Sequence, residues 1–159
     1  MATANVLILP SQAFSQLPKK LADELQKAFA EVVKNFAEGR WEPSELNGGK
    51  LCEAVYTVCH GIATGAMPKS AAKPQDMVGA CRTLEKQTSA LRSVRIQLPR
   101  MLVALYEIRN SRNVGHVGGE VDPNHMDAVC VLQMSKWIMA ELIRILHQMS
   151  VDDAAYLEG

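Results

Sequence analysis

Apolar residues recur at three- and four-residue spacings through most of this 159-residue chain, which is the pattern of amphipathic α-helices. The alternation of apolar and polar residues that is typical of a β-strand does not occur. The pattern therefore predicts an all-α protein, a helical bundle of about five helices within residues 18–149. Residues 1–17 are expected to form an N-terminal arm, and residues 150–159 a short acidic tail.

Capping and breaking residues divide the first half of the chain into two helices. The first is predicted to begin near Pro18, because proline suits a first helical turn, and to end at Gly39. The second is predicted to run from about Pro43 to Gly65. Its Gly48–Gly49 pair weakens the first turns of the helix, and would allow another helix to approach closely.

The second half of the chain is predicted to contain three further helices. Asp76 is expected to cap a third helix that ends near Gln87, and Pro99 to open a fourth. Asp122–Pro123 is a cap followed by a first-turn proline, and predicts a last helix over about 123–149. Polar residues keep to one narrow stripe of this helix. We therefore expect a long apolar C-terminal helix that is central in the bundle or shared with a second subunit.

The composition agrees with one helical domain, because 48% of the residues are apolar and only 5% are aromatic. No run of about 18 apolar residues occurs, so no segment is expected to span a membrane. The four cysteines, Cys52, Cys59, Cys81 and Cys130, form no CxxC pair, and the first residues lack the charged region of a signal peptide. We expect a cytoplasmic protein with reduced thiols, in which Cys52 and Cys59 are core residues rather than a metal or redox site.

Charge is segregated along the chain although the formal net charge is zero. Residues 82–112 contain seven basic and two acidic side chains, whereas residues 113–159 contain two basic and seven acidic ones. One interpretation is a set of solvated helix faces that pair with their neighbours. The other is a basic surface for a phosphodiester backbone, on which Arg95 and Arg100 would bind substrate.

The basic segment ends in the most unusual string of the chain, which runs from Glu107 to Gly119. Arg109 and His116 are seven residues apart, a spacing that would place them on one face of a continuous helix. Asn110 follows the arginine directly. A guanidinium that is always charged, an imidazole that exchanges protons near neutral pH and an orienting amide together suit phosphoryl-transfer chemistry.

Arg109-Asn110, five further residues and then His116 match the arginine, polar residue, four to six residues, histidine motif of the HEPN family (higher eukaryotes and prokaryotes nucleotide-binding). The chain resembles this family through most of residues 18–149, since it is helical, has the motif late and has an apolar helix after it. A competing register starts at Arg112, but only three residues separate Arg112 from His116. We prefer Arg109 and assign Arg112 to substrate binding.

The resemblance implies a fold, an activity and partners. Family members are helical bundles, commonly homodimers, and many are metal-independent endoribonucleases of toxin and phage-defence systems. By this resemblance Arg109, Asn110 and His116 would be catalytic, the substrate would be RNA, and no metal or other cofactor would be needed. Apart from the resemblance, a module that docks on a larger assembly would have a partner or regulatory protein.

Three other interpretations of the same residues stay open. His116 could be a helix-terminal histidine that binds exposed carbonyl groups. A metal could lie among acidic and histidine side chains of residues 116–127, although their spacing matches no metal motif. The whole domain could also be a non-catalytic helical module that dimerises or docks on a larger defence or signalling assembly.

Overall fold

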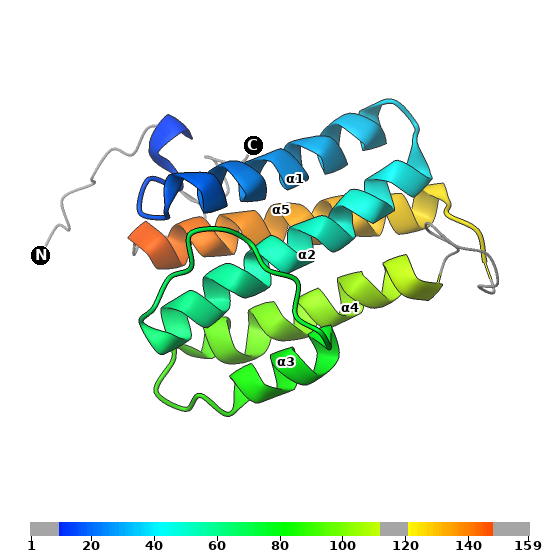
Figure 1. The fold of residues 1–159 in the computed structure, drawn as a ribbon. Coiled ribbons are helices and arrows are strands. Elements are labelled where there is room, and N and C mark those ends of the chain that lie inside the picture. Colours follow the sequence, from blue (N-terminus) through cyan, green and yellow to red (C-terminus); the bar gives the residue numbers. More distant parts are fainter. Residues whose placement is uncertain (1–9, 112–120, 148–159) are drawn as a thin grey trace, which may run out of the picture.

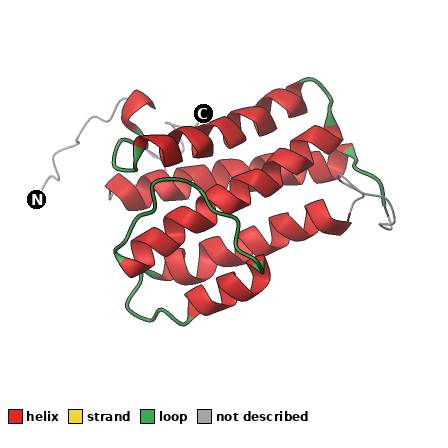
Figure 2. Cartoon of the chain, viewed as in Figure 1, coloured by secondary structure: helices red, strands yellow, loops and turns green. Residues whose placement is uncertain are grey.

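The structure, a computed structural model, describes residues 10–111 and 121–147 (Figure 1). Within these ranges it contains five α-helices and no strand (Figure 2). The helices are α1 (Lys19–Ala37), α2 (Trp41–Thr64), α3 (Met77–Glu85), α4 (Leu98–Ser111) and α5 (His125–His147). A 3-10 turn, Pro10–Gln12, lies before α1, and a π-helical turn, Ser93–Gln97, runs directly into α4. The all-α prediction is confirmed.

Helices α1, α2, α4 and α5 pack side by side as a four-helix bundle, and α3 packs against α4 on the outside (Figure 1). Helices α2 and α5 each contact the three other helices of this bundle. Burial of leucine and isoleucine side chains between the helices supplies the main driving force for folding. The largest fully buried apolar side chains are Leu21, Leu25, Leu51, Leu84, Leu98, Leu102, Leu105, Ile138, Met139, Leu142 and Ile143.

Several helix boundaries follow the local signals in the sequence. Pro18 occupies the N-cap position of α1, and Gly39 follows the helix with a φ of 70°, a left-handed conformation that favours glycine. Asp76 caps α3, because its Oδ1 accepts a hydrogen bond of 3.1 Å from the backbone N–H of Gly79. These predictions are confirmed, although α2 begins at Trp41, before Pro43.

The predicted start of the last helix is wrong. Helix α5 begins at His125, and its cap is Asn124 rather than Asp122. The backbone N–H of Asp127 donates to Asn124 Oδ1 at 2.9 Å, and Asn124 Nδ2 donates to Asp127 Oδ2 at 2.8 Å. This reciprocal pair satisfies a backbone donor of the first turn, which is what a capping residue has to do.

Pro99 does not open α4, contrary to the prediction from the sequence. It is the second residue of α4, and the π-helical turn Ser93–Gln97 already extends the helix before it. The N–H of Leu98 donates to the carbonyl of Ser93, which is the wider π spacing. Pro99 has no N–H to donate, so a helix with altered hydrogen bonding in the preceding turn accommodates it.

Helix α5 contacts α1, α2 and α4, so it has the central position that was one of the two predicted, but it is not the predicted apolar helix. It buries Asp127, Ser135 and Glu141, and it exposes Gln133 and Lys136 to solvent. None of the helices among residues 10–111 and 121–147 combines the length and the apolar character that a bilayer crossing requires.

The end of the predicted N-terminal arm and the two predicted core cysteines are buried. Ala13, Phe14 and Leu17 are buried in the core, and the carbonyl of Ala13 lies 2.6 Å from His147 Nε2 at the end of α5. Cys52 and Cys59 are fully buried, as predicted for core residues. Residues 1–9 and the predicted acidic tail, residues 150–159, lie outside the described residues.

Candidate functional site

Arg109 lies in the last turn of α4 and has two partners on its own helix. Its Nη1 donates a hydrogen bond of 3.3 Å to Oδ1 of Asn110. Its guanidinium carbon lies 5.5 Å from the centre of the Tyr106 ring, within the range of a cation–π contact. Tyr106 precedes Arg109 by three residues, a spacing that puts two side chains on the same face of a helix.

Helix α2 passes close beneath this arginine at its glycine pair. A Cβ atom placed on Gly49 would overlap Cδ of Arg109 and would lie 2.9 Å from its Nε. A Cβ atom on Gly48 would lie 2.9 Å from Cγ1 of Val131 and 3.0 Å from Cδ2 of Leu105. The two glycines therefore let α4 and α5 approach α2 closely, as the sequence predicts, and Gly49 admits the arginine side chain itself.

The charge of Arg109 acts on the interior of the bundle. Cys52 lies one turn along α2 from Gly49, and its Sγ is 3.7 Å from the carbonyl oxygen of Leu102. Burial raises the pKa of the Cys52 thiol far above its ordinary value, and the positive charge of Arg109 acts in the opposite direction. The thiol therefore stays protonated and packs as an apolar group.

Glu45 is a polar residue of this region that sequence reasoning missed. It is fully buried, and it precedes Gly49 by one turn on the same face of α2. Burial of a carboxyl group is costly unless the surroundings compensate for its lost hydration, so such residues are rare in a core. No signal in the sequence indicated this burial, because the approach of Arg109 to Gly49 is seen only in the structure.

The structure describes only part of the remaining predicted motif. His116 and Arg112 are outside the described residues, as is the glycine-rich segment around them. Their proximity to Arg109 therefore stays a prediction. Asn110 is exposed and hydrogen bonded to Arg109, so these two neighbours in the sequence are also partners in space.

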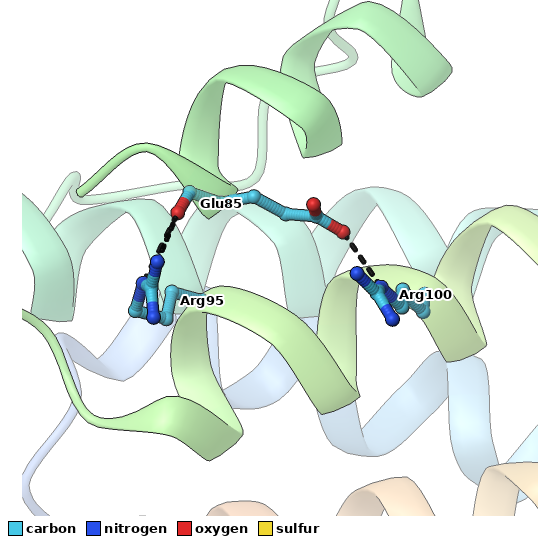
Figure 3. A network of polar contacts seen from close by, with 3 residues as sticks. All are labelled: Glu85, Arg95 and Arg100. Atoms are coloured by element: carbon cyan, nitrogen blue, oxygen red, sulfur yellow. Dashed lines mark hydrogen bonds and ion pairs between the residues drawn. The ribbon is translucent and has the colours of Figure 1, made fainter. Parts of the chain in front are cut away.

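Arg95 and Arg100 belong to a separate network around Glu85, the last residue of α3 (Figure 3). Arg95 donates from Nε and Nη2 to the backbone carbonyl of Glu85, at 3.0 and 2.8 Å. Arg100 Nε donates to Oε1 of the same residue at 2.8 Å. The hydrogen bond from Arg100 lowers the pKa of the Glu85 carboxyl below its ordinary value. The contact of Arg95 with the Glu85 carbonyl satisfies an acceptor at the C-terminus of α3, so Arg95 holds α3 in place.

This network is distant from Arg109. Arg100 and Arg109 are nine residues apart on α4, which separates them by about 14 Å along the axis and turns them to opposite sides. The side chain of Arg100 is 66% exposed, whereas Arg95 is half-buried. Arg109 therefore does not share a surface with Arg95 and Arg100: it lies against α2, whereas they pair with the end of α3.

The described side chains do not gather into a metal site. Among residues 10–111 and 121–147, no group of three or more histidine, cysteine, aspartate or glutamate side chains has the geometry to hold a metal ion. His125 instead packs against Trp41 and Phe36, with ring centres 5.0 and 6.0 Å apart. Of the candidate ligands in the sequence, His116 and Glu120 lie outside the described residues.

A shallow groove of about 360 Å³ lies between α1 and α2, away from Arg109. Its lining includes Glu24, Lys27, Glu31, Lys50 and Glu53, and mixes both signs of charge. One of these side chains is already used in the fold, because Glu24 accepts a hydrogen bond of 2.6 Å from the N–H of Ala71. The groove is therefore better described as the boundary between two packed helices than as a preorganised ligand site.

Comparison of the chain with protein-family models, with curated proteins and with solved structures gives no match. A functional interpretation therefore rests on the chemistry and placement of its own residues. The feature with the most specific chemistry is Arg109, with Asn110 and Tyr106 beside it and Gly49 beneath it.

Proposed function

We propose that this chain is a HEPN-like RNA-binding domain, and that it acts as a metal-independent endoribonuclease of a toxin or phage-defence system in the cytoplasm. The observation that supports this most is the placement of Arg109 at the end of α4, hydrogen bonded to Asn110. An arginine held at a fixed place next to an amide is suited to binding a phosphate group. The all-helical bundle around it is the architecture that the HEPN resemblance implies.

The proposed reaction is an internal transfer at a phosphodiester. The ribose 2′-oxygen forms a bond to phosphorus, and the bond from phosphorus to the 5′-oxygen of the next nucleotide breaks. The products are a 2′,3′-cyclic phosphate and a free 5′-hydroxyl, and the proton of the 2′-hydroxyl ends on the 5′-oxygen. His116 moves this proton, Arg109 stabilises the charge that develops on the phosphate, and Asn110 orients Arg109 or the phosphate.

RNA binding under this proposal uses basic side chains beyond the reacting group. The proposed substrate-binding residues are Arg112, Arg95 and Arg100. The structure describes the last two, and the side chain of Arg100 is the more exposed of them. Arg95 is engaged with the α3 carbonyl, so it would contribute mainly through its positive charge. Binding should weaken as salt is added, because RNA binding releases counterions from the phosphates.

We also propose that two copies of the chain pair through α5. Met126 and Trp137 lie on this helix and are 72% and 39% exposed. Cys130 is exposed between them. Burial of this strip against a second copy would remove apolar surface from water.

The same apolar strip favours a second function, a non-catalytic module that dimerises or docks on a partner or regulatory protein. Such a module has no need for a reactive Arg109. The two functions differ in whether the protein breaks a phosphodiester bond, so an assay of cleavage separates them.

A cleavage assay with matched substrates tests the proposal. Single-stranded RNA should be cut in the presence of EDTA, and the 5′ fragment should end in a 2′,3′-cyclic phosphate. The same oligonucleotide with a 2′-deoxy nucleotide at the cut position should bind but stay intact, because it lacks the attacking hydroxyl. Cleavage that EDTA abolishes, or that proceeds at the deoxy position, would contradict the mechanism.

A further inference from the structure

Arg109 is enclosed on three sides by groups from two helices. The ring of Tyr106 lies 5.5 Å from its guanidinium carbon, Oδ1 of Asn110 accepts its hydrogen bond at 3.3 Å, and Gly49 of α2 lies directly against its side chain. Only a residue without a side chain leaves this space open at position 49, because a Cβ there would overlap Cδ of Arg109.

Gly49 is used for space and not for an unusual backbone conformation. In the part of the chain that the structure describes, the glycines with positive φ are Gly39 and Gly65, both outside the helices. Gly49 lies inside α2, where glycine is less favourable than alanine because it loses more conformational freedom on folding. A glycine at such a position requires a packing reason, and the arginine side chain supplies it.

We propose that Gly49 and Tyr106 are positioning residues that together form a seat for the Arg109 guanidinium. This inference rests on the proposed function, in which Arg109 stabilises charge on the reacting phosphate. Arginine has several rotatable bonds, and electrostatic stabilisation of a transition state depends on a donor that is already in place. The glycine removes the obstacle on one side of the guanidinium, and the tyrosine ring attracts it from another.

The neighbouring glycine provides a matched control. A Cβ on Gly48 would press on Val131 and Leu105, which are buried core residues, rather than on Arg109. Gly48→Ala should therefore lower the thermal midpoint of unfolding and leave cleavage intact at temperatures well below that midpoint. Gly49→Ala should keep the fold, because the arginine side chain can swing away, and should reduce kcat by on the order of 10²-fold with little change in KM.

A second pair of variants tests the tyrosine. Tyr106→Phe keeps the aromatic face and should keep most of the cleavage activity, whereas Tyr106→Leu removes the face and should reduce kcat. If Tyr106→Phe were as inactive as Tyr106→Leu, the hydroxyl rather than the ring would be the important group, and the seat would be contradicted.

The position of Arg109 can also be measured without any substrate. The side-chain N–H signal of Arg109 in an NMR spectrum, assigned by its loss in Arg109→Lys, should be shifted by the nearby Tyr106 ring. Gly49→Ala should move this signal toward the position of a free arginine, and Gly48→Ala should leave it in place. In an Arg109→Ala background, Gly49→Ala should raise the thermal midpoint, because the obstacle is gone and alanine favours the helix.

These readouts separate the two proposals. If the wild-type protein cuts no RNA but the signal moves in Gly49→Ala alone, the ribonuclease proposal fails and the seat for Arg109 stands. If the signal is the same in the wild type and in Gly49→Ala, the seat is overturned, whatever the cleavage assay shows.

Discussion

Single residues of this protein have roles that depend on partners far away in the sequence. Glu141 of α5 is buried, and it accepts hydrogen bonds from Ser93 and from Arg144, the latter at 3.0 Å between Nε and Oε2. Burial is the largest effect and favours the protonated carboxyl, but the hydrogen bonds and the charge of Arg144 outweigh it together. The net result is that the pKa of Glu141 lies below its ordinary value of 4.5.

This lowered pKa predicts a dependence of stability on pH. The folded protein holds Glu141 ionised more strongly than the unfolded chain does, so the unfolded chain binds more protons in acid. The stabilisation is complete above pH 4.5 and is lost as the pH falls through the lowered pKa of the folded state. Wild-type protein should therefore be more stable than Glu141→Gln near neutral pH, and the difference should shrink in acid.

Thermal unfolding followed at several pH values between about 7 and 3 measures this difference. Glu107→Gln, which changes an exposed carboxyl on α4, is the matched control for the loss of one negative charge. A constant difference between wild type and Glu141→Gln across the whole range would contradict the assigned role of Glu141.

At the residue scale, the sequence predicts what local chemistry decides, and it does not predict pairing between residues that are distant in the chain. The burial of Cys52 and Cys59 follows from their spacing on one helix face. Substrate binding by Arg95 and Arg100 stays a prediction, and the sequence did not indicate that both also contact Glu85 at the end of α3. Their nearness to Glu85 depends on how α3 folds back onto α4, which no short sequence pattern encodes.

At the scale of helices, the start of α5 shows the limit of capping signals. Asp122 and Asn124 are both good capping residues, and the proline after Asp122 favoured the earlier start. The structure selects Asn124, because Asp127 lies three residues after it and completes the reciprocal pair. The deciding residue, Asp127, is therefore local in the sequence, and the proline after Asp122 pointed to the earlier start.

The cap of α5 gives a prediction of its own. Asn124→Ala removes the acceptor for the Asp127 N–H and should reduce the free energy of unfolding by about 1 kcal/mol. Asn124→Ser keeps a capping oxygen and should cost much less. Chemical denaturation of the three proteins measures the effect. Equal stability of Asn124→Ala and wild type would show that this cap is not important for α5.

The close approach of α2 and α4 is the element-scale feature that the sequence predicts in part. Gly48–Gly49 indicated that another helix could approach there, and the structure shows that α4 and α5 do so. The identity of the partner atoms could not be predicted, because Arg109 and Gly49 are brought together only by the packing of the bundle. The buried carboxyl of Glu45 escaped prediction for the same reason.

At the scale of the whole molecule, the exposed side chains of α5 predict self-association. Trp137→Glu places a charge in the apolar strip that the proposed dimer buries, and it should convert a dimer to a monomer without loss of helix. Lys136→Glu changes charge at the neighbouring exposed position and is the control. Light scattering at micromolar concentration measures the mass. A monomeric wild-type protein would contradict this pairing and leave the strip for another partner.

The proposed activity assigns complementary roles to two side chains of the chain. His116 would transfer a proton and Arg109 would stabilise charge on the phosphate, so neither can replace the other. Arg112 would affect substrate binding more than turnover. A helical module that only docks on a partner would tolerate all three substitutions, which makes the enzyme and the module distinguishable by mutation.

The most direct test is therefore the single-turnover cleavage of single-stranded RNA by wild type, Arg109→Ala and His116→Ala. Arg92→Ala is a matched control, because Arg92 is an exposed arginine of the same basic segment. Each of the first two variants should lose cleavage by on the order of 10²-fold or more while keeping its helical content, and Arg92→Ala should stay within a few-fold of wild type. Cleavage that survives both the Arg109→Ala and the His116→Ala change would contradict the account.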